Sequence, residues 1–316
     1  MYKIGVDLGG TNIAVGVIDA DNKIIGLSKR KTNTPRPAKE IFDDINLCIA
    51  DAIADAGLKT EDIVSIGVGT PGSVDHETGV ILYANNLDFY NVPAVEFINE
   101  KFPGIKVYID NDANCAALGE ALAGCGKGKK SFIAVTLGTG VGGGIVLDGK
   151  LLVGCNDAGG EIGHMVIAHD GEQCNCDRIG CWERYASATA LVNQTKAAML
   201  LNKDSKMWEL CEGKIENAGG RTAFDAMRLG DECATKVCDD YIKYIAVGTV
   251  NLVNIFQPEL ICFGGGICNE GETLLAPLRK YIAMWRYSKQ QEKQTEICRA
   301  TLGNDAGIIG AALVEY

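Results

Sequence analysis

Residues 4–18 read Ile-Gly-Val-Asp-Leu-Gly-Gly-Thr-Asn-Ile-Ala-Val-Gly-Val-Ile, and residues 133–147 read Ile-Ala-Val-Thr-Leu-Gly-Thr-Gly-Val-Gly-Gly-Gly-Ile-Val-Leu. The two segments align without a gap at an offset of 129 residues, and five of their fifteen positions are identical. Each segment has the pattern of an apolar strand, a turn rich in glycine and threonine, and a return strand. A chain of 316 residues is long enough for two lobes. The repeat therefore predicts two lobes that begin with the same hairpin, with both glycine turns facing one cleft.

Strands and helices are expected to alternate outside the repeat, as judged from apolar periodicity and from the positions of glycine and proline. The expected strands are residues 24–31, 63–68, 105–109 and 260–263, and the expected helices are residues 40–56, 92–100, 113–123, 187–201, 222–229, 231–257 and 306–314. This alternation predicts an α/β fold. We assign residues 1–115 and 300–316 to a small lobe and residues 116–299 to a large lobe.

The charges and the cysteines limit the partners and the compartment. The formal net charge is −11 and the charges are scattered, which argues against nucleic acid or an anionic membrane as the main partner. The chain begins without a signal-like segment, and no apolar run approaches the roughly 18 residues of a membrane helix. Because the thirteen cysteines are odd in number, we expect a cytoplasmic protein in which clustered cysteines bind metal and the others are buried.

Three glycine turns are candidates for a nucleotide site. Glycine lets the backbone approach an anion closely, and backbone amides and a threonine hydroxyl can then donate to that anion. Asp7 can hold a metal-bound water beside the phosphates. Each turn alone also fits an ordinary hairpin, but three turns of similar setting favour a shared role. The candidate residues are Asp7, Gly9, Gly10, Thr11, Gly138, Thr139, Gly140, Gly264, Gly265 and Gly266.

Asp112 is the candidate general base. Phosphoryl transfer to a hydroxyl needs a carboxylate close enough to accept the proton of that hydroxyl. Asp112 stands at an expected junction of strand and helix, which is where open α/β sheets bind ligands. The alternative is that Asp112 caps the helix, a role that Asp110 and Asn114 can also fill.

One histidine and three cysteines form a pattern of metal ligands. An imidazole and three thiols at short loop spacing match a closed tetrahedral zinc site, which leaves no open position for catalysis. The alternative is four reduced side chains in a loop. The zinc would fix the nearby Glu161 and Glu183, whose carboxylates can hydrogen-bond sugar hydroxyls, whereas His169 is interpreted as a surface residue. The four ligands are His164, Cys174, Cys176 and Cys181.

Together these motifs resemble those of the ROK family. Residues 137–164 are similar to the ROK signature at Leu137, Gly140, Val141, Gly142, Gly144, Ile145, Gly154, Gly160, Gly163 and His164. Four motifs look like those of the family and occur in the same order: Asp7-x-Gly-Gly-Thr11, Asn111-Asp-Ala-Asn114, Gly160-Glu-Ile-Gly-His164 and Cys174-x-Cys-x4-Cys-x-Glu183. The resemblance covers most of the chain.

The resemblance implies an actin-like (ribonuclease-H-like) sugar kinase fold with a cleft between two lobes. It also implies magnesium-ATP as the donor, a structural zinc, a homodimer and Asp112 as the catalytic base, with Thr11, Thr139 and Gly265 near the nucleotide. Asp177, in the zinc loop of residues 164–181, departs from the pattern because many members carry glycine there. The implied sugar-binding residues are Gly72, Asn85, Asn86, Asn111, Asp112, Glu161, His164 and Glu183.

Several functions within this family remain as alternatives. Some members are sugar-responsive repressors with a DNA-binding segment ahead of the kinase-like body, whereas this chain starts two residues before its first expected strand and is acidic. Among the enzymes, residues 174–189 look most like bacterial glucokinases. The sequence therefore favours ATP-dependent phosphorylation of glucose, with fructokinase, allose kinase and N-acetylhexosamine kinase as alternatives.

Overall fold

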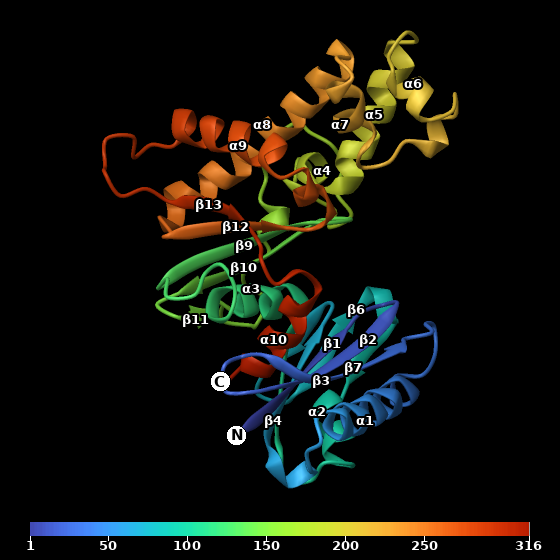
Figure 1. Ribbon diagram of the computed structural model, residues 1–316, viewed down its shortest axis with the longest axis vertical. Coiled ribbons are helices and arrows are strands. Elements are labelled where there is room, and N and C mark those ends of the chain that lie inside the picture. Colours follow the sequence, from blue (N-terminus) through green and yellow to red (C-terminus); the bar gives the residue numbers. More distant parts are fainter. Residues whose placement is uncertain (316) are drawn as a thin grey trace. The chain divides into compact units, whose positions relative to one another are not determined.

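The computed structural model describes residues 1–315, and these form two compact units (Figure 1). Within the described residues, unit 1 comprises Met1–Ala134, Gly144–Gly160 and residues 300–315, and unit 2 comprises Val135–Gly143 and Glu161–Arg299. Residues 116–134 and 144–160, which we expected in the large lobe, group with unit 1. For residues 116–122 the reason is that helix α3 (Asp112–Leu122) packs against helix α10 (Ala306–Leu313).

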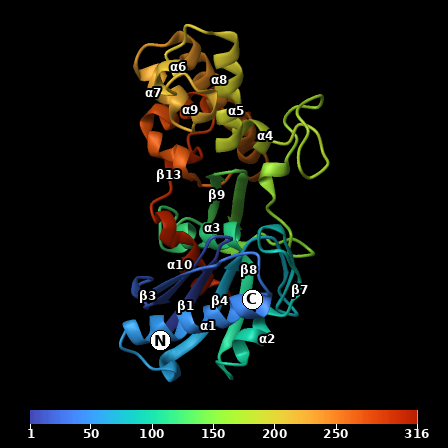
Figure 2. The same ribbon diagram turned by 90° about the vertical axis from the view of Figure 1, so that its right-hand side faces the viewer.

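Unit 1 contains a five-stranded sheet with the strand order β3-β2-β1-β4-β8. β1 and β2 form an antiparallel hairpin, β3 continues it on the outer side, and β4 and β8 run parallel to β1. The parallel strands are joined by connections that include α1 (Ala38–Asp55), which covers one face of the sheet (Figure 2). The strands are β1 (Tyr2–Leu8), β2 (Asn12–Ile18), β3 (Ile24–Lys31), β4 (Ile63–Thr70) and β8 (Lys106–Asn111).

Helix α10 lies in close contact with the opposite face of this sheet because glycines leave room for its backbone. A Cβ atom on Gly5 of β1 would lie 1.8 Å from the Ile308 carbonyl oxygen, and one on Gly67 of β4 would lie 1.8 Å from that of Ala311. α10 also packs against α3. The last helix of the chain thus fixes α3, whose first residue is the candidate base Asp112.

The second sheet has the strand order β11-β10-β9-β12-β13. The repeated segment 133–147 forms most of β9 and β10, which occupy the same places in this order as β1 and β2 do in the first sheet. The structural repeat expected from the sequence is therefore confirmed at the level of strand order. The strands are β9 (Ser131–Leu137), β10 (Val141–Leu147), β11 (Lys150–Leu151), β12 (Leu260–Gly264) and β13 (Glu296–Arg299).

Helices make up most of the rest of unit 2, as the sequence indicated. The sequence analysis missed α9 and β13, although Leu274, Leu275, Leu278 and Ile282 have helical spacing and are buried. Pro277 lies inside α9 and interrupts the signal, since proline is disfavoured in helix interiors. The helices are α4 (Glu183–Ala186), α5 (Ala188–Leu201), α6 (Met207–Leu210), α7 (Thr222–Arg228), α8 (Glu232–Phe256) and α9 (Glu272–Trp285).

The chain segment that connects β4 to β8 forms a small antiparallel sheet, which was also not expected. It consists of β5 (Ser73–Asp75), β6 (Val80–Ala84) and β7 (Phe89–Val92). The helix expected at residues 92–100 is the shorter α2 (Ala94–Asn99), because Val92 ends β7 and Pro93 then precedes the helix. Short strands with few alternating residues give little periodicity, which explains why the sheet was missed.

No helix among residues 1–315 is long and apolar enough to cross a membrane. All thirteen cysteines are free thiols, and Cys48, Cys115 and Cys262 are buried among apolar side chains.

Candidate functional site

The carboxyl edge of the unit 1 sheet brings acidic residues together. β1, β4 and β8 are parallel and in register, so that Asp7 pairs with Gly69 and Gly69 pairs with Asp110. The carboxyl ends of parallel strands meet at one edge of a sheet, and ligands of open α/β sheets bind there. Asp7 at the end of β1 and Asp112 at the start of α3 therefore belong to one edge of unit 1.

Asn111, and not Asp112, occupies the N-cap position of α3. The Asn111 Oδ1 accepts hydrogen bonds from the backbone N–H groups of Ala113 at 2.8 Å and Asn114 at 3.3 Å. Its Nδ2 donates to the Gly72 carbonyl oxygen at 3.1 Å. The Asp112 Oδ1 accepts from the Ala113 N–H at 2.8 Å, within the first turn. The helix has a cap without Asp112, so capping does not account for the Asp112 carboxylate.

Burial disfavours the negative charge of both carboxylates at this edge. Burial, followed by the charge of Asp112, raises the pKa of Asp7 to about 6, while Lys29 acts in the opposite direction. Burial also raises the pKa of Asp112, although the backbone N–H of Ala113 acts in the opposite direction. Partly buried carboxylates that repel one another favour a proton acceptor or a cation site over a purely structural role.

The first glycine turn lies beside the candidate sugar residues of unit 1. A Cβ atom on Gly10 would lie 3.5 Å from the Cβ of Asn86. Asn85 accepts a hydrogen bond from the Tyr83 hydroxyl at 3.0 Å. Gly72 has φ +91°, and a Cβ atom there would lie 1.9 Å from the Tyr83 carbonyl oxygen, so the turn requires glycine. Unit 1 thus groups Gly10 with Asn86, and Gly72 with Asn111.

The second and third glycine turns meet in unit 2. Gly265 has φ +96°, and a Cβ atom on it would lie 2.3 Å from the carbonyl oxygen of Leu137, the residue before Gly138. The second turn is closed by the Gly138 N–H, which donates to the Gly140 carbonyl oxygen at 3.0 Å. It is held to α5 by the Thr189 hydroxyl, which donates to the Thr139 carbonyl oxygen at 2.8 Å. Close packing therefore requires glycine at Gly265, whereas a Cβ atom on Gly138 or Gly266 would meet nothing within 4 Å.

The four expected metal ligands form one cluster in unit 2. Their ligand atoms all lie within 4.8 Å of one another. The Cys174 Sγ is 3.7 Å from the His164 Nδ1, and the Cys176 Sγ is 3.6 Å from the Cys181 Sγ. Ligands about 2.3 Å from a tetrahedral zinc would lie about 3.7 Å apart, which agrees with these distances. The donor set and its geometry fit a structural zinc ion.

The pKa values of two thiols and the backbone conformation at Asp177 also bear on the candidate zinc site. The backbone N–H of Arg178 is the main cause that lowers the pKa of Cys176 to about 7. Burial raises the pKa of Cys181 to about 12, so a bound cation is needed to make it a thiolate at neutral pH. Asp177 has φ +64°, in the left-handed region that favours glycine. The family's glycine and this aspartate therefore meet the same backbone requirement.

Glu183 connects the cysteine cluster to the second glycine turn. Its Oε1 lies 3.4 Å from the Cys174 Sγ and 4.0 Å from the His164 Nδ1. Its Oε2 accepts a hydrogen bond from the Val141 N–H at 3.4 Å. Glu161 is exposed, and its carbonyl oxygen accepts from the His164 N–H at 3.1 Å. Unit 2 thus brings Glu161, His164 and Glu183 close to the cluster, whereas Asn111 and Asp112 belong to unit 1.

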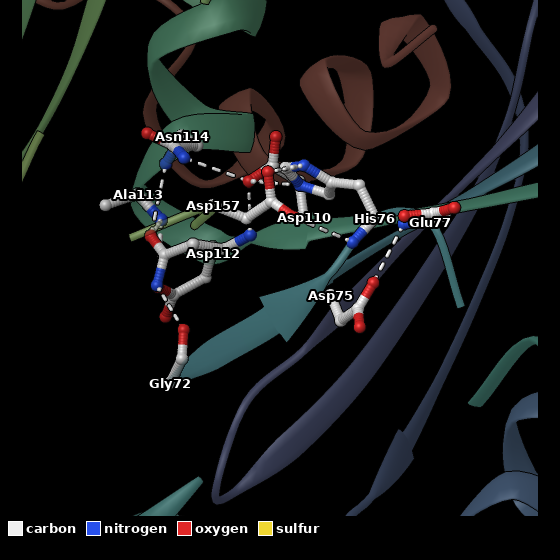
Figure 3. A network of polar contacts seen from close by, with 10 residues as sticks. Gly72, Asp75, His76, Glu77, Asp110, Asp112, Ala113, Asn114 and Asp157 are labelled. Atoms are coloured by element: carbon white, nitrogen blue, oxygen red, sulfur yellow. Dashed lines mark hydrogen bonds and ion pairs between the residues drawn. The ribbon is translucent and has the colours of Figure 1, made fainter. Parts of the chain in front are cut away.

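A histidine that the sequence analysis passed over lies between two carboxylates in unit 1 (Figure 3). The His76 Nδ1 is 2.9 Å from the Asp157 Oδ1, and its Nε2 is 3.6 Å from the Asp110 Oδ1. The His76 backbone N–H also donates to the Asp157 Oδ2 at 3.0 Å. These residues are far apart in sequence and belong to no recognisable motif, so only the folded chain reveals them.

Comparisons with known proteins agree with these observations. The family model described as "ROK family" matches residues 3–315. Glucokinase from Thermotoga maritima is 37% identical over 98% of this chain and 96% of its own length. A crystal structure of a ROK family glucokinase from Streptomyces griseus with glucose and AMPPNP is 34% identical, with a TM-score of 0.80 over 99% of this chain and 98% of that one. A xylose repressor from Caldicellulosiruptor bescii is 30% identical over 88% of this chain and 69% of its own length.

The expected two-lobed α/β fold is thus confirmed, and this chain belongs to the ROK family.

Proposed function

We propose that this chain is a kinase that transfers the terminal phosphoryl group of ATP to the 6-hydroxyl of glucose. The observation that carries the proposal is the carboxylate of Asp112, which lies at the carboxyl edge of a parallel sheet and is not required as the helix cap. Full-length similarity to proteins described as glucokinases, at 34–37% identity, supports both the reaction and the acceptor.

In this mechanism Asp112 accepts the proton of the acceptor hydroxyl as the phosphoryl group is transferred. Its pKa, raised by burial, makes it a stronger base than an exposed aspartate. The glycine turns at residues 9–11, 138–140 and 264–266 offer backbone amides and close approach to the nucleotide. Asp7 would hold the water shell of the magnesium ion that ATP carries, and that ion would neutralise charge on the phosphates.

Glu161, His164 and Glu183 are proposed to recognise the sugar together with Asn111 and the turn at Gly72. A carboxylate that hydrogen-bonds a substrate hydroxyl discriminates strongly, since an analogue lacking that hydroxyl leaves a buried charge unpaired. Zinc would contribute no chemistry to phosphoryl transfer in this scheme. It would hold the loop that carries these residues, because Glu183 lies 3.4 Å from a cysteine of the cluster.

A panel of hexoses in a coupled ADP-release assay tests the acceptor. We expect kcat/KM for glucose to be at least about tenfold above that for fructose and N-acetylglucosamine, the ratio that 1.4 kcal/mol produces. Glu183→Gln should narrow this ratio because the neutral amide no longer favours hydroxyl donors. A better rate with fructose or an N-acetylated sugar would keep the kinase activity and refute the glucose assignment.

A sugar-sensing regulator is the second candidate, favoured by the 30% identity to a xylose repressor. The same assay separates the two functions. A regulator would bind a sugar in calorimetry and release no ADP with any member of the panel. Turnover that disappears in Asp112→Asn would exclude the purely regulatory function.

A further inference from the structure

His76 follows β5 and joins three segments of unit 1. Its side chain is 9% exposed, which leaves the imidazole almost without solvent. On one side its Nδ1 and its backbone N–H both contact the carboxylate of Asp157, at 2.9 and 3.0 Å. On the other side its Nε2 lies 3.6 Å from the Oδ1 of the fully buried Asp110 (Figure 3). His76 is thus nearly buried and lies between two carboxylates that come from distant parts of the chain.

The direction in which the pKa of His76 is shifted is consistent with its place between two carboxylates. Burial lowers the pKa of His76, but the Asp110 and Asp157 carboxylates more than offset this effect and raise the pKa above its ordinary value. Asp75, next in the chain, adds a third acidic group, and its own pKa is lowered mainly by its hydrogen bonds with Thr78. Together these groups favour an imidazolium that is shared by Asp110 and Asp157.

Asp157 belongs to the loop of residues 153–160, which leads directly into Glu161. Gly154, Asp157 and Gly160 have φ values of +83°, +58° and +88°. The loop is closed by the Gly159 N–H, which donates to the Val153 carbonyl oxygen at 2.7 Å. Glycines at such positions leave the unfolded and partly open states many conformations. The paired contact of Asp157 with His76 restricts this loop at its middle, four residues before Glu161.

Asp110 is the last residue but one of β8 and organises the start of α3. Its Oδ1 accepts hydrogen bonds from the Asn111 N–H at 2.6 Å and from the Asn114 Nδ2 at 2.9 Å. The imidazole of His76 therefore reaches, through a single carboxylate, the segment on which Asn111 and Asp112 stand. The same histidine thus contacts both the loop before Glu161 and the strand end before Asp112.

We propose that His76 is a positioning residue for the acceptor site, which holds loop 153–160 through Asp157 and thereby sets the affinity for the sugar, while its contact with Asp110 orients the imidazole. The inference rests on the proposed function, because it assumes that Glu161 and Asn111 contact the acceptor. His76 itself touches no reacting atom in this scheme. Its effect is to hold the loop that precedes Glu161 in one conformation before the sugar binds, which lowers the entropy lost on binding.

Two substitutions at His76 separate its two contacts. His76→Gln places an amide nitrogen near the original Nε2, so it keeps a side-chain donor for Asp110 and loses the side-chain donor for Asp157, while the backbone N–H to Asp157 stays in both variants. His76→Asn places its nitrogen near the original Nδ1, so it keeps the donor for Asp157 and loses the one for Asp110. Both variants lose the imidazolium, so a general loss of stability is common to both and cannot explain a difference between them.

Steady-state kinetics with the best hexose of the panel provide the first readout. We expect His76→Gln to raise the hexose KM at least about tenfold with the ATP KM within about twofold, and His76→Asn to raise the hexose KM less than about threefold. Asp157→Asn keeps an acceptor for the His76 N–H and removes the charge, so it should fall between the two. An unchanged hexose KM in His76→Gln, or an equal rise in both His76 variants, would overturn the proposal.

Hydrogen exchange of residues 153–161, measured without substrate, provides a readout that does not depend on the identity of the sugar. Exchange should be faster in His76→Gln than in His76→Asn. His169→Gln is the matched control, since His169 forms an exposed pair with Asp170 at 2.7 Å and should alter neither readout. If no hexose is phosphorylated by the unaltered protein, the proposed function fails and the positioning role in catalysis falls with it, whatever the exchange shows. If hexose is phosphorylated but exchange or KM does not respond in His76→Gln, only the positioning role fails.

Discussion

The two hairpins of the internal repeat have the same place in their sheets but carry different chemistry. In the first, Asp7 is the last residue but one of β1 and shares an edge with Asp112, and both carboxylates have raised pKa values through burial. In the second, the residue aligned with Asp7 is Thr136, and no acidic side chain stands at that place. The carboxylate near the second turn is instead that of Glu183, which accepts from the Val141 N–H and adjoins the cysteine cluster.

This difference would let one backbone arrangement serve the two roles proposed for the hairpins. The strand, glycine turn and return strand provide close backbone approach in both hairpins, whereas the residues brought to the turn decide what each does. In unit 1 the parallel strands bring buried carboxylates to the turn, which suits proton transfer and a cation. In unit 2 the loop with the four candidate metal ligands brings a carboxylate to the turn, which suits recognition of hydroxyls.

Removal of the Asp112 charge is the strongest test of the role assigned to the first hairpin. We expect Asp112→Asn to lower kcat by about 10²–10⁴, the usual cost of a lost general base, and to change sugar affinity in calorimetry far less. Because asparagine caps helices as well as aspartate does, the capping alternative predicts near-normal turnover for this variant. Near-normal turnover would therefore mean that Asp112 is not a general base, and that the carboxylates beside the first hairpin have no role in proton transfer.

Removal of a proposed zinc ligand tests the role assigned to the second hairpin in the same way. The purified protein should contain about one zinc per chain by elemental analysis, as a single four-ligand cluster requires. Cys176→Ala should lower stability and raise the sugar Kd at least about tenfold, which corresponds to 1.4 kcal/mol, because the loop no longer fixes Glu183. Cys233→Ala, at a partly exposed cysteine of α8 outside the cluster, is the control and should leave the zinc content and the sugar Kd unchanged. Active enzyme without zinc would contradict the proposed role of the cluster.

The effect of the buried Asp7 carboxylate on the free energy of unfolding can be measured without substrate. The pKa of Asp7 is about 6 in the folded chain against 3.8 for an ordinary aspartate, so the folded state holds its proton more tightly than the unfolded state does. Stability is therefore lost as the pH rises from below 4 to above 6, by up to about 3 kcal/mol. Asp7→Asn should recover most of this free energy of unfolding at pH 8 and about half as much at pH 5.

Urea denaturation of the ligand-free protein at both pH values measures this effect. Asp21→Asn, at an exposed aspartate in the turn after β2, serves as the control and should show no such pH-dependent gain. The same Asp7 variant should lose turnover if Asp7 holds magnesium-bound water. A gain that is equal at pH 5 and pH 8 would contradict burial of the charge as its cause.

The sequence predicted those parts of the molecule that depend on local pattern. The repeat at residues 4–18 and 133–147 predicted the two hairpins that occupy corresponding places in the two sheets, and the short spacing from Cys174 to Cys181 predicted the cysteine cluster. α9 was missed because Pro277 interrupts its periodicity, and the sheet β5-β6-β7 was missed because its strands are short. The partnership of His76 with Asp110 and Asp157 depends on tertiary packing between distant segments, and no local pattern encodes it.

The smallest expected effect concerns Asp177, where the chain departs from the glycine that is common in its family. Its φ of +64° lies in the left-handed region, which costs most L-residues roughly 1–2 kcal/mol and costs aspartate and glycine less. We therefore expect Asp177→Gly to change the free energy of unfolding of the zinc-loaded protein by less than about 0.5 kcal/mol, and Asp177→Ala to lower it by about 1 kcal/mol. Urea denaturation of the two variants side by side measures the difference. If Asp177→Gly is as unstable as Asp177→Ala, the carboxylate of Asp177 stabilises the zinc loop directly, and the backbone requirement does not explain why aspartate replaces glycine.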